Sequence, residues 1–138
     1  MEDDEIPHGT FSSDLSYVEK RIIVFALLGS WNIQTAVAGV EHLLKIANSH
    51  FEGNDWGILV DARAWGLCTP DVMEYFNHSV LKFTNIGLRW QAALPNNYMQ
   101  KMVINQYAEI AQSDLTVKYF NNESDALDWL YTKISDER

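Results

Sequence analysis

Short apolar runs that alternate with amphipathic segments are the feature that most restricts the fold of this chain. Residues 21–28 (RIIVFALL) and 56–61 (WGILVD) are strand-sized, and the first is apolar enough for a strand buried on both faces. Residues 88–94 (LRWQAAL) form a third run, which stops at Pro95. Because helical patterns separate these runs, the chain is predicted to be an α/β protein with a largely parallel sheet.

Four segments carry apolar residues at the spacing of an amphipathic helix. Each follows a residue suited to a helix N-cap, and Pro70 suits the first helical position after Thr69. The other predicted caps are Ser30 or Asn32, Asn96 or Asn97, and Asn122. The predicted inner faces comprise Ile33, Ala36, Val37, Val40, Leu43, Leu44 and Ala47; Val72, Phe76, Val80 and Phe83; Met99, Met102, Val103, Tyr107, Ile110 and Ala111; and Ala126, Leu127, Leu130 and Ile134.

Two further strands are predicted at residues 10–15 and 115–120. The second alternates between apolar and polar residues, which is typical of a half-exposed edge strand. Gly29 is predicted to end the strand at 21–28, and residues 62–68 are predicted to form a loop. The predicted order is therefore β-β-α-β-α-β-α-β-α.

The chain length of 138 residues fits one domain, and a hydrophobic content of 47% is enough to bury a core. Four acidic residues at positions 2–5 repel one another. Residues 1–9 are therefore predicted to be a disordered acidic tail, and residues 10–138 a single α/β domain.

Charge, hydrophobic run length and cysteine content argue against a nucleic-acid partner, a membrane span and secretion. The net charge of −9, from 10 Lys+Arg against 19 Asp+Glu, argues against a nucleic-acid partner, which requires clustered basic residues. No apolar run reaches the ~18 residues of a membrane span. The acidic N-terminus differs from a basic signal peptide, and the single cysteine, Cys68, precludes an internal disulfide. These features predict a cytoplasmic protein without a membrane span.

No motif for cofactor, metal or nucleophilic chemistry is found. The turn after residue 28 lacks GxGxxG and GxxxxGK[ST], and there is no GxSxG elbow. Asp61 ends a strand as in a phosphate-accepting receiver domain, but the additional acids and the lysine of that site are missing. The four histidines lack metal-binding spacing. The chain is therefore predicted to be non-enzymatic, with no cofactor and no metal.

Any ligand is expected at the carboxyl ends of the strands. Candidate ligand-binding residues there are Trp31, Asp61, Trp65 and Cys68. The two tryptophans lie in predicted loops at the same sheet edge, where they either cover the core or form the wall of a pocket. Cys68 precedes a helix, so it is either a dipole-activated thiolate or a buried thiol. Thr69 is either an N-cap or a phosphorylation site.

Three segments together resemble the SpoIIAA-like family of small bacterial domains, which is related to STAS and CRAL-TRIO folds. They are GSWN at 29–32, DWGILVDARAWGLCTPD at 55–71 and YFNNESDALDWL at 119–130. The resemblance extends from about residue 10 onward. It implies a mixed sheet of four to five strands flanked by helices, and it implies no defined activity.

The two related groups imply different functions. STAS relatives bind a kinase that phosphorylates a serine at the start of the second helix, and Thr69 stands at that position. The usual Asp-Ser pair is replaced by Cys68-Thr69, and Pro70 follows. The CRAL-TRIO relationship implies binding of apolar small molecules, for which Trp31 and Trp65 are the candidate residues.

Three functional hypotheses follow. The first is a regulatory STAS-like module that binds a protein partner, and the second is a carrier or sensor for a lipid or other apolar small molecule. The third is a thiol-dependent enzyme that uses Cys68. Self-association into a homodimer, through an exposed tryptophan cluster or the edge strand at 115–120, is a further hypothesis.

Overall fold

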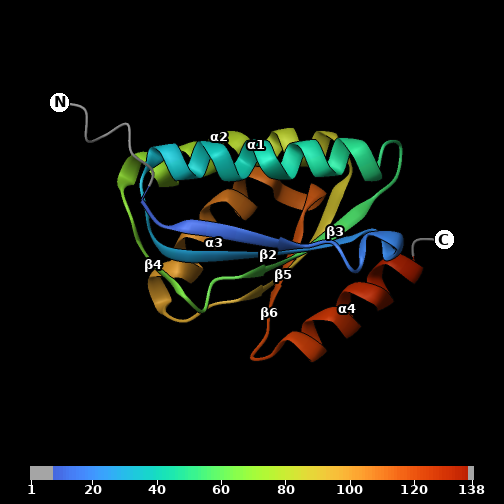
Figure 1. The fold of residues 1–138 in the computed structure, drawn as a ribbon. Helices are drawn as coiled ribbons and strands as arrows, with labels where there is room; N and C mark the ends of the chain where they lie inside the picture. Colours follow the sequence, from blue (N-terminus) through green and yellow to red (C-terminus); the bar gives the residue numbers. More distant parts are fainter. Residues whose placement is uncertain (1–7, 137–138) are drawn as a thin grey trace.

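The computed structural model describes residues 8–136 and contains one mixed sheet with four helices (Figure 1). The strands are β1 (Thr10–Asp14), β2 (Ile22–Trp31), β3 (Trp56–Asp61), β4 (Trp65–Cys68), β5 (Leu88–Leu94) and β6 (Thr116–Tyr119). The helices are α1 (Ile33–His50), α2 (Pro70–Asn85), α3 (Tyr98–Ala111) and α4 (Glu123–Asp136), with short 3-10 turns at Val18–Lys20 and Gln112–Asp114. The predicted α/β class is confirmed.

The sheet order is β1-β2-β3-β5-β6, and β4 pairs with β2 outside this path. Strand β1 is antiparallel to β2, whereas the β2–β3, β3–β5 and β5–β6 pairs are parallel. The largely parallel arrangement was expected from the helical segments between the strands. Strand β6 lies at an edge, as its alternating sequence predicts.

The helices cover the two faces of the sheet unequally. Figure 1 shows α1 and α2 side by side above the sheet and α4 across its opposite side. Along β2, Ile23, Phe25 and Leu27 pack into the cluster under α1, α2 and α3. Ile22 and Val24 pack into the cluster under α4. The prediction that this strand is buried on both faces is therefore confirmed.

The end of β2 differs from the prediction. Gly29 does not end the strand; with φ of +76° it forms an irregularity, and pairing resumes at Trp31. Residues 62–68 are not only a loop, because they contain β4, which pairs Trp65 with Gly29 and Cys68 with Trp31. The sheet therefore gains a sixth strand that the hydrophobic pattern did not predict.

Three asparagines cap helices as expected. Asn32, Asn97 and Asn122 accept hydrogen bonds from the backbone N–H groups of Thr35 (3.3 Å), Gln100 (3.0 Å) and Asp125 (2.9 Å). The prediction for Thr69 is only partly right. Thr69 occupies the N-cap position before Pro70, but its hydroxyl bonds to the Asp71 carboxylate and makes no backbone cap.

Most of the predicted inner faces are buried, but two positions on α3 are wrong. Met102 and Ile110 are 40% and 42% exposed. Helix α3 instead buries Gln100, Val103, Ile104 and Ala111. The polar side chain of Gln100 thus lies on the inner face, where it hydrogen-bonds to the backbone groups of Trp65 and Asn96.

The predicted N-terminal tail falls mainly on residues 1–7, which lie outside the described residues. The backbone of His8 is held by α1: its N–H donates to Asn32 Oδ1 (3.2 Å) and its carbonyl accepts from Thr35 Oγ1 (2.6 Å). None of the helices in the described part of the chain is long and apolar enough to span a membrane.

Gly87 links α2 to β5 in a conformation that other residues rarely adopt, with φ of +107°. A Cβ atom here would lie 2.3 Å from the backbone oxygen of Asn54. We expect Gly87→Ala to lower the free energy of unfolding by about 3 kcal/mol, measured by urea denaturation.

The matched control is Gly53→Ala, because Gly53 also has a positive φ (+80°) but no heavy atom within 4 Å of the added Cβ. Its expected loss is about 1 kcal/mol, from backbone strain alone. Equal losses in the two variants would contradict the close approach at Gly87.

Candidate functional site

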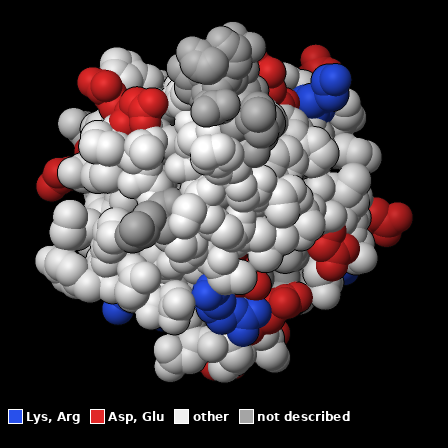
Figure 2. Space-filling model, turned by 60° about the vertical axis from the view of Figure 1, so that its left-hand side comes forward, with Lys and Arg blue, Asp and Glu red and all other residues white. Residues whose placement is uncertain are grey.

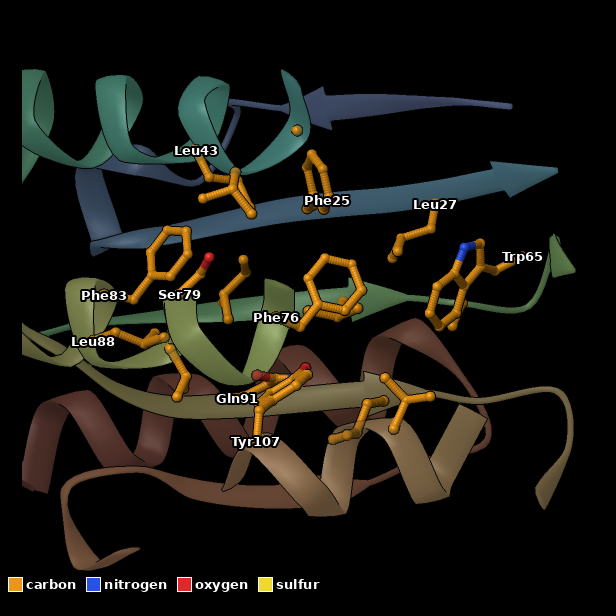
Figure 3. Close-up of a pocket in the computed structure, with 18 of the residues that line it drawn as sticks. Phe25, Leu27, Leu43, Trp65, Phe76, Ser79, Phe83, Leu88, Gln91 and Tyr107 are labelled. Atoms are coloured by element: carbon orange, nitrogen blue, oxygen red, sulfur yellow. The ribbon is translucent and has the colours of Figure 1, made fainter. Parts of the chain in front are cut away.

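An apolar cavity of about 100 Å³ lies between the sheet and helices α1, α2 and α3 (Figure 3). Strands β2, β3 and β5 form its floor, and Trp65 of β4 contributes at the carboxyl end of the sheet. Six of the lining residues are aromatic: Phe25, Trp31, Trp65, Phe76, Phe83 and Tyr107. The cavity is neither sealed from solvent nor a shallow surface groove.

Three of these rings form a cluster at the carboxyl end of the sheet. The ring centroids of Trp31 and Trp65 are 6.0 Å apart, and Phe76 lies 6.1 Å from Trp31 and 6.2 Å from Trp65. The Trp31–Trp65 interplanar angle is 75°, an edge-to-face geometry that aromatic pairs favour. All three rings also line the cavity.

Helix α1 contributes to the cavity through a missing side chain. A Cβ atom at Gly39 would lie 3.2 Å from Trp31 Cη2 and 3.4 Å from Phe25 Cζ. Glycine therefore lets both rings approach the α1 backbone. Val40 and Leu43 line the cavity on the same helix.

The structure brings together the two tryptophans that the sequence singled out. They lie in strands β2 and β4, not in loops, and are 3% and 4% exposed, so they offer no exposed surface for self-association. The Trp31 indole N–H donates to the carbonyls of Thr10 (3.0 Å) and Leu28 (3.2 Å). Trp65 Nε1 is buried without a hydrogen-bond partner among the described residues.

A buried glutamine hydrogen-bonds to the backbone of Trp65. Gln100, at the start of α3, donates from Nε2 to the Trp65 carbonyl (2.6 Å) and accepts from the Asn96 N–H (2.5 Å). Both backbone groups are thereby satisfied, which buried polar groups require. The contact joins the short strand β4 to α3.

The polar side chains inside the cavity were not among the predicted site residues. Gln91 of β5 donates from Nε2 to the hydroxyl of Tyr107 on α3 at 2.6 Å. Burial raises the pKa of Tyr107, so its hydroxyl stays protonated at neutral pH. Ser79 of α2 also lines the cavity, and its hydroxyl donates to the Tyr75 carbonyl at 2.7 Å. The signal available in the sequence was Gln91, a polar residue within the apolar run LRWQAAL.

Asp61, the third predicted site residue, does not line the cavity. Its carboxylate forms an ion pair with Arg63, with Oδ2 2.9 Å from Nη2 and Oδ1 3.0 Å from Nε. The hydrogen bond from Arg63 lowers the pKa of the Asp61 carboxyl despite partial burial. This pairing fixes the turn that leads into β4.

Cys68 and Thr69 also lie outside the cavity lining. Cys68 is partly buried and packs against the α1–α3 cluster. Burial raises the pKa of its thiol, and the negative charge of Asp71 raises it further. Thr69 is exposed. Across residues 8–136, no group of three His, Cys, Asp or Glu side chains is placed to hold a metal ion.

The raised pKa predicts a poorly reactive Cys68, because only the thiolate is nucleophilic. We expect iodoacetamide at pH 7.5 to alkylate Cys68 several-fold more slowly in the native protein than in the same chain unfolded in urea, with mass spectrometry as the readout. Faster alkylation of the native protein would contradict this assignment and would revive the hypothesis of a thiol-dependent enzyme.

Comparison with known proteins agrees with this fold. A similar solved structure is an uncharacterized protein of the DUF3478 family from Shewanella loihica PV-4, described as having a SpoIIAA-like fold. The match covers 91% of this chain and 95% of the Shewanella chain, with 16% sequence identity and a TM-score of 0.67. This similarity supports the SpoIIAA-like fold alone. None of the curated proteins matches this chain. The family model that matches spans residues 17–133, and the chain therefore belongs to the family described as a domain of unknown function, DUF7793.

Proposed function

We propose that this protein binds a small apolar molecule in the cavity between the sheet and helices α1–α3, as a carrier or sensor. The observation that carries this proposal is the cavity itself, about 100 Å³ in volume and lined almost entirely by aromatic and aliphatic side chains. Protein interiors are normally packed with few voids larger than a water molecule. A cavity of this kind needs a physical reason, and ligand binding supplies one.

Occupation of the cavity would be energetically favourable. Side chains that line an empty space lack dispersion partners on one side. An apolar ligand restores these contacts and leaves water at the same time, at about 25 cal/mol per Å² of buried apolar surface. A water molecule gains little there, because the lining offers few polar partners.

The volume restricts the size of the ligand. An apolar cavity of about 150 Å³ binds benzene. A cavity of about 100 Å³ is smaller, so one ring or a short branched chain is about the largest ligand that it suits. This size excludes a lipid with a long acyl chain, which was among the ligands considered from the sequence, because such a chain needs considerably more space.

Toluene is a suitable probe of the proposal. At ten times its Kd it should raise the free energy of unfolding by about 1.4 kcal/mol, measured by thermal denaturation. Val80→Phe extends a ring from α2 into the cavity and should abolish toluene binding, while stability stays unchanged or rises by about 1 kcal/mol.

The matched control is Leu81→Phe, because Leu81 is the next residue of α2 and is 45% exposed. This variant should bind toluene as the wild type does. Failure of the wild-type protein to bind toluene, or equal binding by Val80→Phe, would contradict the proposal.

A second candidate function is regulation through a protein partner at the start of α2. The observation that favours it is the exposed Thr69 hydroxyl, which is not used to cap the helix. Figure 2 shows the end of the molecule where β4 and the starts of α1 and α2 lie, with few charged side chains across its middle. Phosphate on Thr69 would be favoured by the α2 dipole and opposed by the nearby Asp71 carboxylate.

Mass spectrometry of protein purified from its own cells tests this second candidate. The candidate predicts phosphate on Thr69 and a partner that is captured by the wild type but not by Thr69→Ala. Thr69→Ala should change the free energy of unfolding by less than about 0.5 kcal/mol, because no cap bond is lost. An unmodified Thr69 together with identical captures would exclude this role.

A further inference from the structure

Two polar side chains stand together at one side of the largely apolar cavity. Gln91 reaches it from the middle of β5 and is 2% exposed, and Tyr107 reaches it from α3. Figure 3 shows the two side chains together below Phe76, on the side of the cavity away from α1. Their mutual bond, from Gln91 Nε2 to the Tyr107 hydroxyl, is 2.6 Å long.

This bond leaves hydrogen-bonding capacity unused. The Gln91 amide has two N–H donors and an acceptor oxygen, and the Tyr107 hydroxyl both donates and accepts. Among the described residues, the structure gives no further partner to the Gln91 side chain or to the Tyr107 O–H. If the amide is turned over, Tyr107 donates to its oxygen and both N–H groups become free. In either orientation, the pair still offers both a donor and an acceptor.

Unused buried polar groups are costly, at about 1–3 kcal/mol for each group left without a partner. A purely hydrocarbon ligand would leave the polar groups of Gln91 and Tyr107 without partners. A ligand with one hydroxyl or carbonyl group would remove part of it, because that group can bond to Gln91 or Tyr107. Ser79 lines the same cavity and has an oxygen that can accept a further bond.

Charged ligands do not fit the cavity. Its lining contains no Lys, Arg, His, Asp or Glu side chain. A carboxylate or ammonium group inside it would therefore be buried without an opposite charge, which is strongly unfavourable. Burial raises the pKa of Tyr107, so its hydroxyl is also neutral and acts as a donor at neutral pH.

We infer that the ligand class is a neutral molecule of about one ring that carries a single hydroxyl or carbonyl group, held by the Gln91–Tyr107 pair, with the ring among Phe25, Phe76 and Val80. This inference rests on the proposed function of the cavity and specifies its ligand. Simple phenols and aromatic ketones or alcohols of this size have the required chemistry.

Toluene and phenol test the inference, because they are nearly equal in size and toluene carries a methyl group where phenol carries a hydroxyl group. Their Kd values are measured by titration calorimetry with the full chain, with Tyr107→Phe, with Gln91→Leu and with the double variant. Comparing the same ligand across these proteins cancels the free energy of removing that ligand from water. The double variant, which leaves phenol no partner in this pair, should weaken phenol binding about five- to tenfold, as expected for one net hydrogen bond, and leave toluene binding unchanged or tighter.

Each single variant should weaken phenol binding less than the double variant, because the remaining side chain can still bond to the phenol hydroxyl. Each variant is checked for cooperative unfolding. The matched control is Tyr119→Phe, because the Tyr119 hydroxyl donates to Asn105 Oδ1 of α3 (2.5 Å) and Tyr119 does not line the cavity. This variant should leave both affinities unchanged. Benzoate, which is charged at pH 7, should not bind to any of the proteins.

The outcomes separate the two proposals. Equal effects of the double variant on phenol and toluene would overturn the inference, and toluene binding to the wild type would still support the proposed function. Benzoate binding as tight as that of phenol would also overturn the inference, because it would show that the cavity accepts charge. Failure of both toluene and phenol to bind the wild type would overturn both proposals.

Discussion

The packing of Trp31, Trp65 and Phe76 is the interaction on which the rest of this structure depends. The three rings come from β2, β4 and α2, and their centroids lie 6.0–6.2 Å apart. Their contact holds the short strand β4 against the end of β2 and closes the carboxyl end of the α1–α3 core. The same three rings form part of the cavity lining, so the contact that supports this end of the fold also borders the cavity.

The regular part of the fold could be predicted because burial determined its sequence pattern. Residues 56–61 and 88–94 match β3 and β5, and the apolar run at 21–28 correctly indicated burial on both faces. Strand β4 could not be predicted, because it has only four residues, includes Gly66 and gains its pairing from a distant strand. Gly29 was predicted to end the strand, although the strand continues to Trp31. An isolated glycine is typical of both a strand end and a bulge, so the sequence alone does not distinguish them.

The candidate site was partly predictable. Trp31 and Trp65 were expected at one sheet edge, and the parallel topology brings them into contact. Asp61 was singled out for its position at a strand end, but Arg63, two residues later, pairs with it. Tyr107 was predicted on the inner face of its helix, but neither Gln91 nor Tyr107 was predicted as a site residue, because their contact depends on how α3 packs on β5, which a local pattern does not determine. The polar residue within a buried strand was the one available sign.

The proposed function requires an apolar space among these side chains that accepts an apolar molecule. A crystal structure of the protein under xenon pressure tests it most directly, because xenon enters apolar cavities without specific polar contacts. The account predicts a xenon atom between β2 and α2, in contact with Phe25, Phe76 and Val80. A structure in which these side chains close the space, and in which xenon is absent from it, would contradict the account.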